Sequence, residues 1–148
     1  MHVIGICSDH AGFELKEYIK LYFKDKDTVF MVDFGSNSSE SCDYPVFGHK
    51  LAESIEDGFV DVGIAICGTG QGMSMTLNKH EKVRCALCWN ADIAKFARLH
   101  NDANVIALPA RFIWPDQAVK TIETFLNTEF EGGRHQKRID LIPIRKDE

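Results

Sequence analysis

The sequence lacks any apolar run that approaches the ~20 residues a helix needs to cross a bilayer, so no membrane span is expected. It also lacks a secretory signal, because the apolar run from Val3 to Cys7 is short and gives way to Ser8, Asp9 and His10. Positive charge is not in excess: the net charge of −5 argues against a nucleic-acid binder that relies on bulk electrostatics. We therefore expect a cytoplasmic protein.

Cysteine patterns typical of disulfide or zinc frameworks are also absent. There are five cysteines, and an odd number fits a reducing compartment better than a set of disulfides. Cys85 and Cys88 are three residues apart, but a structural zinc site needs four ligands, and neither a second such pair nor paired histidines appear. Residues three apart in a strand point to opposite faces, so we predict that both cysteines pack in the core. The sequence thus predicts no metal site.

What the chain does have is an alternation of extended apolar runs and helical patterns. Its 148 residues, 45% hydrophobic and 26% charged, predict one globular domain over 1–148. Strands are predicted at 2–7, 28–34, 60–66, 83–88 and 104–108. Helices are predicted at about 15–23, 44–55, 91–99 and 115–126, and a further helix follows the glycine-rich loop and reaches residue 78. Five strand–helix units in series predict an α/β fold, a single-domain three-layer α/β/α Rossmann-like fold with a five-stranded parallel sheet.

Ligands of such folds bind outside the carboxyl ends of the strands, where the third predicted strand leads into a glycine-rich turn. Gly68, Gly70 and Gly72 follow the apolar run that ends at Ile66, and a helix begins after them. The backbone N–H groups of such a turn, together with the helix N-terminus, form an anion site. Cys67 stands at the mouth of this site, where a thiolate is favoured, so it is a candidate base or nucleophile.

Three familiar glycine loops do not match this turn. A Walker A loop ends in Gly-Lys-Ser/Thr, whereas Gly72 is followed by Met73. The G-x-G-x-x-G spacing of dinucleotide-binding loops is missing as well. No arginine follows Cys67 until Arg84, which argues against a cysteine phosphatase. A buried cysteine in a tight turn is the simpler interpretation, but the density of glycines favours the anion site.

Two further turns carry polar residues, each with two open interpretations. At the first strand-to-helix turn, Asp9 is either a helix cap or a ligand for sugar hydroxyls, and His10 either binds phosphate or shuttles protons. His100 ends the fourth predicted helix, where it either complements the helix dipole or acts as an acid–base group. Asn101 beside it is then an amide donor to the substrate.

Basic residues are densest near the C-terminus. Arg134 and Arg138 are four residues apart and share a face if the segment is helical, which suits bidentate binding of phosphate. A solvated terminal helix is the alternative that composition alone favours. Arg111, just past the fifth predicted strand, is a further candidate for phosphate binding.

Six short motifs along nearly the whole chain resemble those of the type B ribose-5-phosphate isomerases, in the wider group that includes galactose-6-phosphate isomerase subunits. They are Ser8-Asp9-His10-Ala11-Gly12, Asp43-Tyr44-Pro45, Cys67-Gly68-Thr69-Gly70-Gln71-Gly72, Asn78-Lys79, His100-Asn101-Asp102-Ala103-Asn104-Val105 and Glu131-Gly132-Gly133-Arg134-His135. The resemblance implies interconversion of ribose 5-phosphate and ribulose 5-phosphate through an enediolate, in the pentose phosphate pathway, with no metal and no organic cofactor.

The resemblance also implies a role for each candidate residue. Cys67 is the base that moves a proton between C2 and C1, and the amides around Gly68, Gly70 and Gly72 stabilise the enediolate oxygen. His100 with Thr69 opens the furanose ring, Asp9 and Tyr44 contact the sugar, and the phosphate is held by His10, Arg111, Arg134 and Arg138. In this family the site lies at a dimer interface. We therefore expect a homodimer or a tetramer, with the segment from about residue 131 packed on a partner subunit.

Both the base and the substrate have alternatives. One branch of the family lacks the cysteine and places a glutamate base where this chain has Met73, which cannot accept a proton, so Cys67 is the predicted base. An isomerase of a six-carbon sugar phosphate, such as galactose 6-phosphate or allose 6-phosphate, differs only in pocket depth. A non-catalytic sugar-phosphate-binding subunit should have lost the base, yet Cys67, Thr69 and His100 are all present.

Overall fold

The structure, a computed structural model, describes residues 1–145. Helices and strands alternate along it up to the last two helices. The elements are β1 (His2–Ser8), α1 (Phe13–Phe23), β2 (Val29–Asp33), α2 (Tyr44–Glu56), β3 (Val62–Cys67), α3 (Gln71–Leu77), β4 (Cys85–Leu87), α4 (Ala91–Asn101), β5 (Val105–Pro109), α5 (Pro115–Asn127) and α6 (Arg134–Ile139).

The strands form one parallel sheet in the order β2-β1-β3-β5-β4. The chain first moves outward from β1 to β2 and then returns to the other side of β1 with β3. Connections therefore diverge between β1 and β3, and open parallel sheets bind ligands at such a switch point. Asp9 directly follows β1 and Cys67 ends β3, so both lie there. The predicted five-stranded parallel sheet is confirmed.

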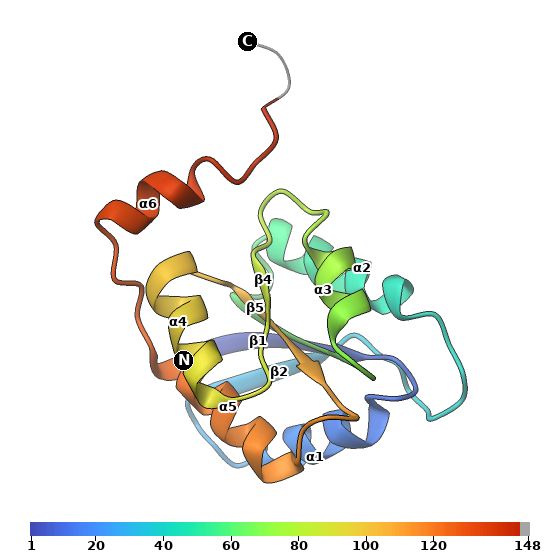
Figure 1. Cartoon of the computed structure of the whole chain (residues 1–148). Helices are drawn as coiled ribbons and strands as arrows, with labels where there is room; N and C mark the ends of the chain where they lie inside the picture. The colour runs from blue at the N-terminus through green and yellow to red at the C-terminus, as the bar shows by residue number, and fades with distance from the viewer. Residues whose placement is uncertain (146–148) are drawn as a thin grey trace.

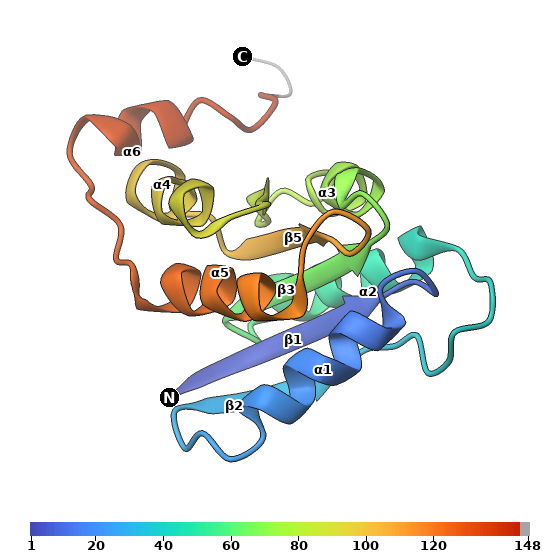
Figure 2. The same cartoon turned by 60° about the horizontal axis from the view of Figure 1, so that its bottom comes forward.

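Helices cover both faces of this sheet, with α2 and α3 on one side and α1 and α5 on the other (Figures 1 and 2). Ile19 of α1, Ala94 of α4 and Ile122 of α5 are buried in one core cluster. Leu51 of α2 and Leu77 of α3 are buried in the second cluster, on the opposite face. Strands buried on both faces have nearly continuous apolar sequences, as the central β3 does. The predicted three-layer arrangement is confirmed.

The edge strand β4 is shorter than the predicted strand at 83–88. Cys85–Leu87 pair with β5, whereas the N–H of Arg84 donates to Oδ1 of Asn104 at 2.8 Å. At this end the side chain of Asn104 thus takes the place of a backbone hydrogen bond between β4 and β5. Cys88 lies in one core cluster and Cys85 packs against the other, so the predicted opposite orientation of the two cysteines is confirmed.

The segment that carries the C-terminal arginines is helical, which the sequence analysis left open. Arg134 and Arg138 of α6 are exposed, while His135 and Ile139 are buried. Helix α6 contacts α4 of its own chain and is set off from the body of the sheet (Figure 1). Packing of this segment on a partner subunit stays a prediction.

Lys16, which is not among the candidate residues named from the sequence, is fully buried. Its Nζ lies 2.8 and 2.9 Å from the carboxylate oxygens of Asp33 and donates to the Ser36 carbonyl. Burial alone would raise the pKa of Asp33, but hydrogen bonds from Lys16 and Lys20 outweigh it and hold that pKa below its usual range. The ion pair ties α1 to the end of β2 and to the loop before α2, beside the switch point.

Candidate active site

Cys67 is the last residue of β3 and is 4% exposed. Its strand partner is Pro109, and its carbonyl accepts a hydrogen bond from the N–H of Ala110 at 2.9 Å. Strand pairing and the following turn of β5 therefore fix the backbone that carries the thiol. The side chain belongs to the core cluster on the α2 and α3 face.

The glycine loop that follows presents backbone N–H groups without protein acceptors. Within residues 1–145, the N–H groups of Gly68, Thr69 and Gly70 donate to no acceptor in the protein. Gly70 has φ of 72°, a left-handed conformation that favours glycine, and a Cβ there would lie 2.5 Å from Leu87 Cδ1. The N–H of Gln71 donates to Oγ1 of Thr69 at 3.3 Å, which shapes the turn. Unpaired amides beside a thiol are suited to binding a negatively charged oxygen.

Two side chains from other loops lie against the glycine loop. A Cβ at Gly72 would lie within 2.5 Å of the Tyr44 ring, so this position needs glycine for the ring to pack there. A Cβ at Gly68 would lie 3.1 Å from Nη1 of Arg111, whose N–H also donates to the Gly68 carbonyl at 3.0 Å. Tyr44 and Arg111 thus border the loop from the start of α2 and from the end of β5.

Asp9 and His10 lie at the same edge of the sheet. Asp9 is 6% exposed, its N–H donates to the Ile66 carbonyl at 3.1 Å, and its Oδ1 accepts from the N–H of Gly12 at 3.0 Å. One carboxylate oxygen of Asp9 therefore binds the backbone just before α1, in line with the predicted capping role. Nδ1 of His10 accepts from the N–H of Cys42 at 3.2 Å and so holds the loop that leads to Tyr44.

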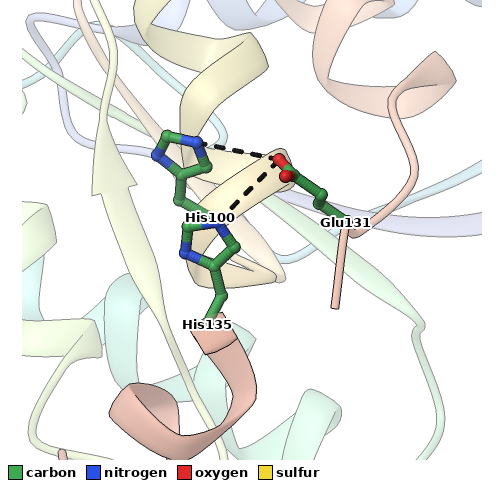
Figure 3. Close-up of side chains that lie close together, drawn as sticks. All are labelled: His100, Glu131 and His135. Carbon is green, nitrogen blue, oxygen red and sulfur yellow. Dashed lines mark ion pairs between the residues drawn. The ribbon is translucent and has the colours of Figure 1, made fainter. Parts of the chain in front are cut away.

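His100 lies in a different group, at the carboxyl end of α4. Its Nε2 is 3.8 Å from Oε2 of Glu131, and its ring stacks on that of His135 with centroids 4.3 Å apart (Figure 3). Burial, followed by the neighbouring His100, holds the pKa of His135 below its usual value. Asn101 follows His100, and Arg134 and Arg138 lie on α6 beside His135.

The group around Cys67 and the group around His100 lie at opposite ends of the strands, Cys67 at the carboxyl end and His100 at the amino end. Helix α4 ends at Asn101 just before β5 begins at Val105, whereas Cys67 pairs with Pro109 at the other end of β5. The strand steps between Val105 and Pro109 span about 13 Å. In Figure 2 the arrowheads of β1 and β3 point away from the side where α6 lies. One chain therefore does not bring His100 to Thr69 or Cys67, and it does not bring Arg134 to Arg111.

Glu131 and His135 occurred in the sequence only as parts of a motif. Their contact with His100 depends on α6 packing against α4, and no local spacing reveals such packing. Lys16 did carry a signal, because it shares a helical face with Ile19 and Phe23, both of which are buried.

No helix within the described residues is long and apolar enough to span a membrane.

The chain resembles known proteins along nearly its full length. The model of the Ribose/Galactose Isomerase family matches residues 4–142. Ribose-5-phosphate isomerase B of Escherichia coli strain K12 is 38% identical over 142 residues, which cover 96% of this chain and 95% of that protein.

Solved structures agree with this resemblance. The ribose 5-phosphate isomerase of Thermotoga maritima superposes with a TM-score of 0.93 and 46% identity, over 95% of this chain and 97% of that one. Ribose-5-phosphate isomerase B of Mycoplasma genitalium, solved with bound ribulose-5-phosphate, gives a TM-score of 0.89 and 42% identity, over 95% of this chain and 93% of that one.

Proposed function

The chain belongs to the ribose/galactose isomerase family, and on this basis we propose that it interconverts ribose 5-phosphate and ribulose 5-phosphate with Cys67 as the base. The observation that carries the role of Cys67 is its thiol at the end of β3, next to three loop amides without acceptors. Within the described residues all five cysteines are free, which suits the reducing cytoplasm that we propose as its location.

The reaction moves one proton between adjacent carbons. The thiolate of Cys67 takes the proton from C2 of the open-chain aldose, which leaves an enediolate with its negative charge on oxygen. The same proton is then delivered to C1, while a hydroxyl proton moves from O2 to O1, and the product is the ketose. No bond forms between sulfur and carbon. A positioned acid–base group of this kind contributes ~10²–10⁴ in rate.

The loop amides stabilise the charge that develops between these two proton transfers. The N–H groups of Gly68, Thr69 and Gly70 need no rearrangement to donate to an enediolate oxygen, because no protein acceptor competes for them within residues 1–145. Each such donor is worth ~10²–10³ in rate. Tyr44 packs on Gly72, and Asp9 is held beside Ile66, so both border the place where the sugar carbons would bind.

The remaining residues come from a second copy of the chain. Ring opening needs an acid–base group near O4, the ring oxygen, or near O1 of the furanose, and His100 lies at the far end of β5 from Thr69 in its own subunit. A homodimer in which His100 and Asn101 of one chain approach Thr69 of the other completes the site. Arg134 and Arg138 then meet Arg111 and His10 of the partner chain around the phosphate.

A coupled assay that offers ribose, allose and galactose phosphates in parallel tests the substrate. We expect the highest kcat/KM for ribose 5-phosphate, because the six-carbon sugars need a deeper pocket between Cys67 and the phosphate-binding residues. The Cys67→Ser variant, purified in the same way, serves as the control for a contaminating isomerase. A higher kcat/KM for either six-carbon sugar would assign the chain to the other branch of the family.

Replacement of Arg134 by alanine should weaken binding of the phosphate. A charge-assisted hydrogen bond is worth ~1.5–3 kcal/mol, so we expect KM for ribose 5-phosphate, and the inhibition constant of inorganic phosphate, to rise at least about tenfold. Lys137→Ala removes an exposed cation from the same helix and is the matched control. An unchanged KM together with unchanged phosphate inhibition would contradict the role of Arg134.

A further inference from the structure

His100, Glu131 and His135 bring three metal-ligating groups together. One ligand atom from each lies within 4.8 Å of the other two, and Oε2 of Glu131 is 3.8 Å from Nε2 of both histidines (Figure 3). The proposed isomerisation uses only His100 of the three. The other two residues therefore have no assigned role.

A second observation points to a ligand at the same place. His135 is 6% exposed, and its Nε2 is buried without a hydrogen-bond partner. Buried polar atoms are nearly always hydrogen-bonded, so an imidazole nitrogen left in this state needs an explanation. This nitrogen is directed toward the Glu131 carboxylate, at a distance longer than a hydrogen bond.

The backbone holds the three residues in place. The N–H of Glu131 donates to the Leu99 carbonyl at 3.1 Å, next to His100, and the N–H of His135 donates to the Gly132 carbonyl at 3.3 Å. The first bond holds Glu131 against the end of α4, and the second shapes the turn that leads into His135. The group is assembled by the fold and does not depend on a chance approach of surface side chains.

Two imidazoles and a carboxylate are a donor set for divalent transition cations. Ligands at about 2.0–2.2 Å from a tetrahedral ion lie about 3.4 Å from one another. The two distances of 3.8 Å between Glu131 and the imidazoles must therefore shorten by about 0.4 Å, and the histidine pair, which lies within 4.8 Å, by at most about 1.4 Å. The two rings are 15° from parallel and must tilt for both nitrogens to face one ion. Within the single chain the side chains of His100 and Glu131 are 40% and 55% exposed, so the chain's own packing leaves them room for that adjustment.

We propose that His100, Glu131 and His135 form a binding site for a divalent transition cation such as Ni²⁺ or Zn²⁺, and that the bound ion inhibits the isomerase. The inhibition rests on the proposed function, because the ion would bind the imidazole of His100, which is the group proposed to open the sugar ring. The binding itself does not rest on it. The cation is an inhibitor in this scheme and takes no part in the reaction.

Titration calorimetry with Ni²⁺ on the untagged protein tests the binding. Nickel is the better probe because imidazole suits it, whereas sulfur ligands such as Cys67 attract Zn²⁺. We expect one Ni²⁺ per chain and at least about tenfold weaker binding in Glu131→Gln, since loss of even an outer-shell partner costs metal sites that much. Glu129→Gln, an exposed change two residues away, is the matched control and should bind as the wild type does.

A second histidine pair needs its own control. Nδ1 of His49 lies 2.7 Å from Nε2 of His80 on the α2 and α3 side of the molecule. His49→Gln should leave Ni²⁺ binding unchanged. Loss of binding in His49→Gln, or undiminished binding in Glu131→Gln, would overturn the proposed site.

Inhibition is measured as the rate at each Ni²⁺ concentration divided by the metal-free rate of the same variant. We expect Ni²⁺ to inhibit the wild type at the concentrations that saturate the calorimetric site, and EDTA to restore the rate. The inhibition curve of Glu131→Gln should shift at least about tenfold to higher Ni²⁺. Saturation of the site with no loss of rate would refute the inhibitory role. Absence of isomerase activity in metal-free buffer would instead refute the proposed function, and the calorimetry would still test the site.

Discussion

Replacement of Cys67 by serine is expected to lower kcat for ribose 5-phosphate by at least ~10²–10⁴, the contribution of a positioned acid–base group. An alcohol is far too weakly basic to take a proton from carbon, so the first proton transfer has no substitute. The KM should change little, because the residues proposed to bind the phosphate, Arg111, Arg134 and Arg138, would do so away from the reacting carbons. Steady-state kinetics of the purified variant measure both quantities.

The other cysteines supply the controls for this result. Burial raises the pKa of the Cys7 and Cys85 thiols, and it raises that of Cys88 to about 12, so these three should react slowly with iodoacetamide. Cys42 is half-buried, and Cys42→Ser makes the same chemical change outside the glycine loop.

Alkylation by iodoacetamide gives a second measurement. We expect the extent of alkylation of Cys67, followed by mass spectrometry, to track the loss of activity. Saturating sugar phosphate should slow this alkylation. If Cys67→Ser keeps most of its kcat, the base lies elsewhere, and Asp9 is the next residue to test.

A mixture of two inactive variants is expected to regain activity. Cys67→Ser removes the proposed base, and His100→Asn removes the proposed ring-opening group at the other end of β5. In a two-fold symmetric dimer each site takes Cys67 from one chain and His100 from the other. Half of the dimers in an equal mixture are heterodimers, each with one intact site and one doubly defective site, so about a quarter of the wild-type activity should return.

The matched control pairs Cys67→Ser with a double variant that carries both substitutions. Every site in that mixture lacks the thiol, so no activity should return although heterodimers form. Native mass spectrometry verifies that the subunits have exchanged. If verified heterodimers of the two single variants stay inactive, the site is not shared between chains. Sedimentation of a fully active species of 16.7 kDa, the mass of one chain, would contradict the dimer directly.

The strands, the helices and the group of site residues around Cys67 can be predicted from local sequence patterns. The position of Cys67 at the end of β3 was predictable, since a continuous apolar run marks a strand buried on both faces and glycines mark the turn. The length of β4 was not, because a side chain, Asn104, ends its pairing from twenty residues away. The burial of Lys16 likewise depends on Asp33, which lies on another element.

The separation of His100 from Cys67 was available in the sequence, although spacing along the chain did not suggest it. A helix between two parallel strands returns the chain to the edge where the next strand begins, so the end of α4 must lie at the amino end of β5. The contact of His100 with Glu131 and His135 could not be found in this way. It depends on how the short α6 packs on α4 beyond a glycine pair, and no periodic pattern encodes that angle.

Because β5 keeps the two groups apart within each chain, a shared site makes turnover a property of protein concentration. Dilution below the dimer dissociation constant would dismantle active sites while every chain stays folded. In that regime the number of sites grows with the square of the monomer concentration, so specific activity rises with the amount of protein instead of staying constant. A cell that halves its supply of this chain would then lose more than half of its isomerase activity. The separation of Cys67 from His100 by the length of β5 would in this way impose a minimum protein concentration for efficient turnover.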